Sequence, residues 1–234
     1  MIIFLISLTT ILTFMAWSLI KAPFLRYSLG VLTLLSLIAS VAFLTDHFVN
    51  HTGMEVKTTT KTNTIYSAGD SSVAFGLLIY KEVGTSSGNY VLIYRDKKTD
   101  KKASAHFVPN TKKIIEAVKK TATYKTARQD EATLTMTTKR YVWKSDLYEW
   151  LFGFAGESNE LVSQKSVVTV PEDTWLILTQ DEAKKLASLS TAMQKQMTTD
   201  PTKATTMKAL SQSNPKEYAA LQVEIVKEAL KTAK

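Results

Sequence analysis

The chain opens with two long apolar runs, residues 1–20 and 27–45, joined by a short basic turn. At about 1.5 Å of helical rise per residue, each run can cross the roughly 30 Å hydrocarbon core of a bilayer. We therefore predict a transmembrane helical hairpin over residues 1–45, in which small residues of the second run allow close packing. Cleavage near Ala42 is the alternative, but a leader normally has a basic start and one apolar run.

From residue 46 onward the apolar segments shorten to strand length and are separated by clusters of Gly, Ser, Asp and Lys. Residues 72–83 and 89–95 are rich in apolar side chains, which is typical of strands buried on both faces. The Gly and Ser residues between them predict a hairpin. Further strands are expected at residues 54–64, 103–108, 133–143, 161–170 and 175–178. The pattern predicts an α+β domain over residues 46–179 with a mainly antiparallel sheet.

A short helix is expected after Pro109, which ends the preceding strand. The spacing of Ile114, Ile115 and Val118 places them on one face of this helix, and we expect that face to pack on the sheet. The charged residues on the other side would then face water; they are Lys112, Lys113, Glu116, Lys119 and Lys120.

Helical periodicity returns in the C-terminal segment, residues 180–234. Thr179 and Glu182 form a capping box, and Pro201 and Pro215 each stand directly after a capping residue. Two apolar stripes follow, formed by Leu186, Leu189, Met193 and Met197 and by Tyr218, Leu221, Ile225 and Ala229. Helices with one apolar stripe each are expected to pack on the sheet domain as a layer.

Charge predicts the orientation of the hairpin. Lys21 and Arg26 are the only charged residues before Asp46, and both lie at the turn. Because basic residues are retained on the cytoplasmic side, we predict a multi-pass protein of the cell membrane with both termini extracytoplasmic. The chain has no cysteine, which excludes disulfides, thiolate metal sites and cysteine nucleophiles.

Three histidines are candidates for chemistry. His47 and His51 would share a helix face if the second apolar helix continues outward, and there they could hold a metal or be protonated together. Two imidazoles need further ligands, so a structural role is favoured. His106 lies in an expected strand without a recognisable partner, and a structural role is favoured there as well. We expect no metal and no cofactor.

A glycoside hydrolase would need two carboxylates about 5–10 Å apart, one of them with a raised pKa. The available pairs are Asp130 with Glu131, Glu157 with Glu160, and Glu172 with Asp173, all in polar stretches typical of solvated turns. Gly84-Thr85-Ser86-Ser87-Gly88 has the form Gly-x-Ser-x-Gly, but it lies in the turn of the expected hairpin and not between a strand and a helix, as a nucleophile elbow would. A Walker A loop is absent, and we predict no catalytic residue. Alternating basic and aromatic residues at 139–144 indicate a strand rather than nucleic-acid binding.

Residues 145–156 are unusual because they are apolar nearly all round. Ser145 can cap a helix of about ten residues, which is too short to cross a bilayer. Burial as core under the sheet is the favoured interpretation, and docking on lipid, on the hairpin or on a partner protein is the alternative. The candidate interaction surface comprises Trp150, Leu151, Phe152 and Phe154.

Several segments resemble those of one family. They are the two-span hairpin, Ala105-His106-Phe107-Val108-Pro109, Thr138-Lys139-Arg140-Tyr141-Val142-Trp143, Leu151-Phe152-Gly153-Phe154, Val170-Pro171 and Asp173-Thr174-Trp175. Essentially the whole chain resembles a family of uncharacterised two-span membrane proteins of lactic acid bacteria and related Gram-positive bacteria, a domain of unknown function. The resemblance implies the architecture and a Gram-positive cell envelope, and it implies no activity and no functional residue.

Anchoring without catalytic machinery favours a non-enzymatic accessory or interaction protein of the cell envelope. The expected partners are the lipid bilayer and another membrane or envelope protein, with no nucleic acid. An envelope enzyme or a binder of anionic wall polymer is the alternative. A buried carboxylate pair in a deep pocket would favour the enzyme, and a flat basic face would favour the polymer binder.

Overall fold

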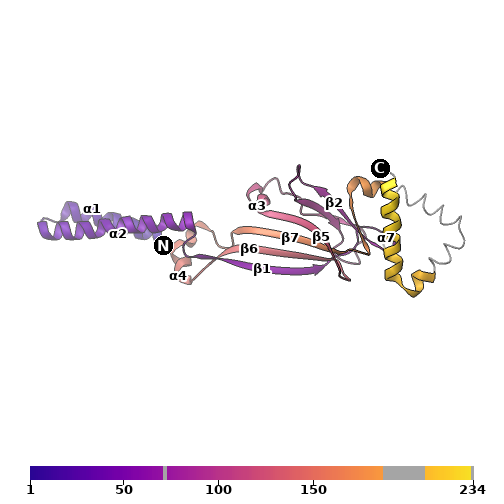
Figure 1. Ribbon diagram of the computed structural model, residues 1–234. Helices are drawn as coiled ribbons and strands as arrows, with labels where there is room; N and C mark the ends of the chain where they lie inside the picture. The colour runs from indigo at the N-terminus through magenta and orange to yellow at the C-terminus, as the bar shows by residue number, and fades with distance from the viewer. Residues whose placement is uncertain (71–72, 187–208, 233–234) are drawn as a thin grey trace. The chain divides into compact units, whose positions relative to one another are not determined.

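The computed structural model of the protein describes residues 1–70, 73–186 and 209–232 (Figure 1). These residues form two compact units. Unit 1 comprises Met1–Thr58 and Lys139–Val162, and unit 2 comprises the described residues of Thr59–Thr138 and Ser163–Lys234.

The helices with both ends among the described residues are α1 (Ile2–Leu19), α2 (Pro23–Asn50), α3 (Ile114–Val118), α4 (Asp146–Phe152) and α7 (Pro215–Thr232), with a 3-10 helix η1 (Gly153–Ala155). The strands are β1 (Met54–Thr64), β2 (Gly76–Glu82), β3 (Tyr90–Tyr94), β4 (Ser104–His106), β5 (Lys120–Ala127), β6 (Thr133–Trp143), β7 (Leu161–Pro171) and β8 (Trp175–Thr179).

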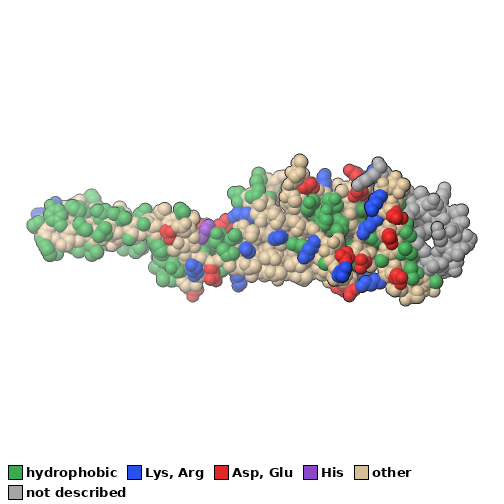
Figure 2. Space-filling model, viewed as in Figure 1, with side chains coloured by type: hydrophobic (Ala, Val, Ile, Leu, Met, Phe, Trp, Pro, Cys, Tyr) green, Lys and Arg blue, Asp and Glu red, His purple; other side chains and the backbone are tan. Residues whose placement is uncertain are grey.

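Among the described residues, α1 and α2 are the two helices long and apolar enough to cross a membrane. α2 begins at Pro23, a residue favoured in the first helical turn, and continues past the expected end at residue 45 to Asn50. Large apolar side chains of both helices are exposed, and hydrophobic side chains cover most of the hairpin in Figure 2. Such a surface is typical of helices that contact lipid.

Small residues line the contact between α1 and α2. Thr9 and Ala16 are buried on α1, and Gly30 and Ser40 are buried on α2. The indole of Trp17 lies so close to Gly30 that an added Cβ would meet its Nε1 at 2.7 Å. The prediction that small residues of the second helix allow close packing is confirmed at Gly30 and Ser40.

The strands form two four-stranded sheets with the orders β1-β6-β7-β5 and β4-β3-β2-β8. The expected hairpin of β2 with β3, and the pairing of β3 with β4, are confirmed as antiparallel. The expectation of one mainly antiparallel sheet is corrected, because β2 pairs in parallel with β8, and β5 pairs in parallel with β7. Parallel pairs join strands that are not connected by a short turn, so the hairpin signals in a sequence do not reveal them.

The central core lies between these sheets in unit 2. Leu78 and Leu92 of one sheet pack with Leu134, Val168 and Val170 of the other, and all five side chains are buried. Close packing of branched side chains between the sheets stabilises this unit.

α7 covers the opposite face of the second sheet. Leu77 and Leu176 project there against Val223 and Val226 of α7. Because successive residues of a strand point to opposite faces, the neighbours Leu77 and Leu78 contribute to two different cores. The prediction that β2 is buried on both faces is confirmed.

The caps expected at the C-terminal helices are present where the structure describes them. The Thr179 amide donates to the Glu182 carboxylate at 3.0 Å, and the Glu182 amide donates to the Thr179 hydroxyl at 3.2 Å, as in a capping box. The Glu217 amide donates to Asn214 Oδ1 at 3.2 Å at the start of α7. The expected helix start at Pro201 lies outside the described residues, as do Leu189, Met193 and Met197.

α3 differs from the expectation. It holds five residues, and Ile114, Ile115 and Val118 are 67%, 75% and 73% exposed instead of facing the sheet. Ala117 is the α3 residue that turns inward, where it lines a small cavity. At about 3.6 residues per turn, so short a helix has no complete stripe to bury, and its branched residues stay on the surface.

A chain ending at Thr179 tests whether α7 is a layer on the sheet domain. The truncation removes Val223 and Val226 but leaves the core between the sheets, so we expect cooperative unfolding at a lower urea concentration. The midpoint is read by circular dichroism of the detergent-solubilised protein. Val226→Ala, which keeps α7, is the matched control and should lower the midpoint less. Loss of cooperative unfolding on truncation would contradict the prediction.

Candidate functional site: the histidine cluster at the end of α2

α2 ends in a tight turn that leads the chain into β1. His51 has a left-handed backbone with a φ of 53°, and Gly53 follows with a φ of 91°. Left-handed residues commonly end helices, and glycine adopts that conformation without a steric penalty. Gly53 also lies against the ring of Tyr148 with no room for a Cβ. The turn therefore requires glycine at this position for both reasons.

His47 lies in the last turns of α2 and is fully buried. Its ring stacks on Phe152 of α4 with centroids 4.1 Å apart, and on Trp143 of β6 with centroids 5.5 Å apart. We call His47, Trp143, Phe152 and Glu157 the histidine cluster. Because aromatic rings cover the imidazole, its two nitrogens must find hydrogen-bond partners within the protein.

Both nitrogens of His47 have such partners. Nδ1 lies 2.7 Å from the carbonyl oxygen of Thr52, and Nε2 lies 2.7 Å from Oε2 of Glu157. A carbonyl oxygen only accepts, so Nδ1 carries a hydrogen and donates it. The contact with Glu157 then holds one more proton, as imidazolium with carboxylate or as neutral imidazole with carboxylic acid. Either pair has no net charge, which reduces the cost of burying it.

This arrangement suits positioning rather than catalysis. The His47 ring is closed off from any substrate, and its partners come from three separate parts of unit 1. These are the turn after α2 at Thr52, the end of β6 at Trp143, and the segment after η1 at Glu157. The histidine cluster therefore connects the outer end of α2 to the folded segments beside it.

The alternative of a metal held by His47 and His51 does not fit this geometry, because oxygen atoms already engage both nitrogens of His47. The His51 ring stacks on Tyr141 with centroids 4.0 Å apart, and its Nδ1 is buried without a partner among the described residues. In the part of the chain that the structure describes, no group of three or more His, Asp and Glu side chains could hold a metal ion.

α4 explains why residues 145–156 are apolar nearly all round. Tyr148 and Phe152 point toward α2, and the Phe152 ring lies 5.1 Å from that of Phe43. Leu147 and Trp150 point away and are 62% and 58% exposed. Phe152 is buried, but against Phe43 and His47 of α2 and not under the sheet as expected, and the expectation of burial is wrong for Trp150.

The remaining candidate surface residues lie at the same helix end. Phe154 in η1 is 49% exposed, and Leu151 is partly buried. The Met1 nitrogen donates to the carbonyl oxygens of Trp150 and Leu151 at 3.0 and 2.8 Å. The start of α1 is thus held at the C-terminal end of α4, where carbonyl groups have no partner within the helix.

In unit 2, His106 has partners that the sequence does not indicate. Its ring stacks on Tyr94 with centroids 3.9 Å apart, and its Nε2 lies 3.0 Å from the Ser104 hydroxyl and 3.7 Å from Asp96. Burial is the main reason why the pKa of the Tyr94 hydroxyl is raised above its usual range. These contacts fit the structural role that we expect for His106.

In each of the two acidic pairs of unit 2, one carboxylate forms an ion pair with a basic side chain at the surface. Asp130 Oδ1 lies 2.6 Å from the Lys216 ammonium, and Glu172 Oε1 lies 2.9 Å from Arg128 Nε. The hydrogen bond from Lys216 lowers the pKa of the Asp130 carboxyl. An acid catalyst would need the opposite shift, so Asp130 is not suited to protonate a glycosidic oxygen.

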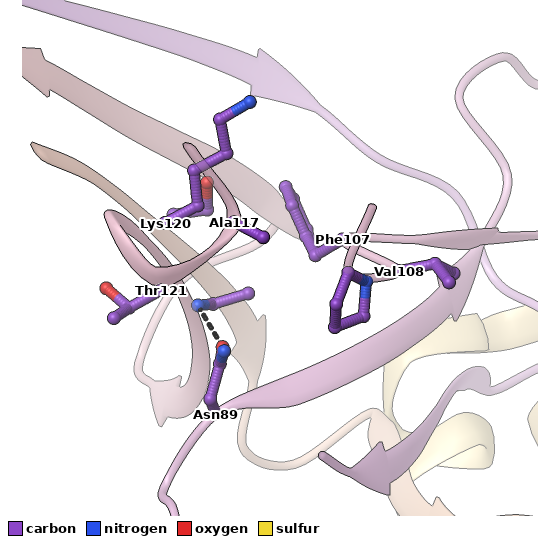
Figure 3. Close-up of a pocket in the computed structure, with 9 residues that line it drawn as sticks. Asn89, Phe107, Val108, Ala117, Lys120 and Thr121 are labelled. Atoms are coloured by element: carbon purple, nitrogen blue, oxygen red, sulfur yellow. Dashed lines mark hydrogen bonds between the residues drawn. The ribbon is translucent and has the colours of Figure 1, made fainter. Parts of the chain in front are cut away.

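A small cavity of about 60 Å³ lies in unit 2 beside α3 (Figure 3). Asn89 reaches across to accept a hydrogen bond from the Ala122 amide at 2.7 Å, while Lys120 extends away from the other lining side chains. The Ser166 hydroxyl, which also lines the cavity, is buried without a partner among the described residues. The volume suits one or two water molecules, whereas ligand pockets measure about 300–1,000 Å³.

The fold and the cluster together define a protein with a membrane-compatible helical hairpin and an α+β region of two sheets. Residues 22–186 match the domain of unknown function DUF4811, and the chain belongs to this family. The match includes α2, every strand among the described residues and the whole histidine cluster. No curated protein and no solved structure matches the chain.

The sequence indicates His47 as a candidate but does not indicate its partners. Glu157 is 110 residues away in the sequence, and it appears there as half of an acidic pair with Glu160. A histidine at the end of an apolar helix could have indicated the need for a distant polar partner, but no spacing reveals which residue supplies it.

Replacement of Glu157 tests the histidine cluster. Glu157→Ala leaves Nε2 of buried His47 without a partner and should destabilise unit 1 by about 1–3 kcal/mol. Glu157→Gln keeps a hydrogen-bonding group at this position and should cost less. The measurement is urea unfolding in detergent, monitored by tryptophan fluorescence.

The exposed Glu149 provides the control for this comparison. Glu149→Ala should change stability by no more than about 0.5 kcal/mol. Equal effects of Glu157→Ala and Glu149→Ala would contradict a structural role for the His47–Glu157 pair.

Proposed function

We propose that this protein is a membrane-anchored, extracytoplasmic interaction protein of a Gram-positive cell envelope, without enzymatic activity. α1 and α2 form the anchor, and the sheets with α7 form the part presented outside. The observation that carries the interaction role is an exposed apolar patch outside the hairpin. The patch consists of Val108, Ile114, Ile115 and Val118, which are 60–75% exposed.

The composition of this patch supports a protein partner. Hydrophobic side chains gather over α3 in Figure 2, with basic side chains beside them. Lys112, Lys113 and Lys120 surround the apolar residues, and Glu116 of α3 pairs with Lys113 and Lys120 at 3.7 and 3.4 Å. Apolar patches with a polar rim are typical of interaction sites. The basic rim favours a partner that has acidic residues around an apolar surface.

The orientation of the anchor follows from charge. Lys21 and Arg26 lie at the turn between the helices, and Arg26 Nε donates to the Trp17 carbonyl oxygen at 3.2 Å. The ring of Trp17 meets that of Tyr27 edge to face at 5.9 Å. Basic residues mark the cytoplasmic side and aromatic residues the interface, so we place this turn in the cytoplasm and both termini outside.

A binder of anionic wall polymer is the second candidate. The observation in its favour is an open depression around the loop between β3 and β4. It is lined by the cationic residues Arg95, Lys98, Lys101 and Lys102 and by the anionic residues Asp70 and Asp100. The excess of cations would favour an anionic polymer, although the two carboxylates weaken that attraction.

Cysteine labelling of intact cells tests the topology, because the chain has no cysteine of its own. Ser87→Cys, in the loop between β2 and β3, should react with a membrane-impermeant thiol reagent. Ala22→Cys, at the turn between α1 and α2, should react only after the cells are permeabilised. The reverse labelling pattern would contradict the proposed orientation.

Site-specific photocrosslinking tests the patch. A photoreactive amino acid at position 115 should give a discrete adduct in native membranes, and one at the exposed Thr99 should not. The double substitution Ile114→Ser and Ile115→Ser should reduce the copurification of the crosslinked protein. It should leave the free energy of unfolding within about 0.5 kcal/mol of the wild type, because both residues are exposed. Identical adducts at positions 115 and 99 would contradict the interaction site.

A further inference from the structure

α4 and η1 carry an apolar face that remains exposed in unit 1. Leu147, Trp150 and Phe154 are 62%, 58% and 49% exposed, and their spacing of three and four residues places them along one side. Tyr148 and Phe152 occupy a different side, where they pack near Phe43. We call Leu147, Trp150 and Phe154 the outer face of α4.

This outer face continues onto the last turn of α2. Phe48 and Val49 are 46% and 70% exposed, and the rings of Phe48 and Phe154 meet edge to face at 6.3 Å. An apolar surface therefore extends without interruption from the hairpin onto η1. The hairpin side of that surface belongs to helices that are long and apolar enough to cross a membrane.

Helix lengths place α4 at the boundary of the hydrocarbon layer. α1 has 18 residues, which is about 27 Å of helix against roughly 30 Å of hydrocarbon. The start of α1 contacts the end of α4, through hydrogen bonds from Met1 to the carbonyl oxygens of Trp150 and Leu151. When the hairpin spans the bilayer, α4 therefore lies where α1 leaves the hydrocarbon.

We propose that α4 is an interfacial helix whose outer face inserts into the boundary between the lipid headgroups and acyl chains. Tryptophan favours this layer because its ring is large and apolar while its N–H can bond to headgroups. A helix in this layer has one apolar side toward the lipid and charged residues away from it. Each residue of a helix turns the chain by about 100° around the helix axis. Glu149 is two residues after Leu147, so it lies about 200° from Leu147, on the opposite side of α4.

This inference rests on the proposed insertion of the hairpin and adds a second contact with the bilayer. Continuity with the hairpin surface favours lipid over a protein partner, since any protein on the outer face would have to compete with lipid around Phe48 and Val49. An inserted α4 would fix the depth of unit 1 in the membrane, and through the histidine cluster it would fix the outer end of α2.

Spin labels on single cysteines in the full chain test the proposal. The protein is reconstituted in vesicles of phosphatidylcholine and phosphatidylglycerol, and collisions with oxygen and with a water-soluble nickel chelate are measured. Oxygen concentrates in lipid and the chelate in water. We expect the ratio of oxygen to nickel collisions to shift toward oxygen at Leu147→Cys and toward nickel at Glu149→Cys, its matched control two residues away. Phe154→Cys should repeat the result of Leu147→Cys.

A third position separates this inference from the proposed anchor. Leu32→Cys lies in the middle of α2, where the wild-type side chain is 60% exposed, and it should favour oxygen if the hairpin is inserted. If position 32 contacts lipid but the ratio of oxygen to nickel collisions is equal at positions 147 and 149, the proposed interfacial helix is contradicted and the proposed anchor is not. Water contact at position 32 would overturn the anchor itself.

Discussion

Burial of His47 is the constraint on which the structure of unit 1 depends. An imidazole removed from water needs a partner for each nitrogen, and Thr52 and Glu157 supply them at 2.7 Å. Thr52 can do so because α2 ends in the left-handed turn formed by His51 and Gly53. Glu157 can do so because α4 and η1 return the chain to α2. One buried side chain thus sets both the end of the hairpin and the path of the segment beside it.

The aromatic residues of α4 lie on two sides of the helix. Phe152 covers the His47 ring, while Trp150 remains exposed on the other side. A helix of seven residues has little stability of its own, since isolated helices shorter than about 12–15 residues are marginal in water. Packing on α2 stabilises one side of α4, and the proposed lipid contact would stabilise the other. The exposed patch on α3 belongs to unit 2.

Residue patterns predict the local elements well because those depend on neighbouring residues. The hairpin follows from helix length, and the strand containing Leu77 and Leu78 follows from its continuous apolar run. Pairing of β2 with β8 and of His47 with Glu157 depends on residues far apart in the chain, which no local period records. Ile115 and Trp150, which are exposed although their spacing places them on apolar helix faces, show a second limit of local patterns. Helical spacing shows that a residue lies on an apolar face, but it does not show whether protein, lipid or a partner covers that face.

The most direct test of this account is the state of His47 in the full chain. Nitrogen-15 NMR of histidine-labelled protein in lipid nanodiscs should show a His47 Nδ1–H proton that exchanges slowly with water, because it is buried and bonded to Thr52. His106, which is less buried, should exchange faster, and Glu157→Ala should move the Nε2 resonance of His47. A His47 ring whose protons exchange as fast as those of a free imidazole, unaffected by Glu157→Ala, would contradict the account.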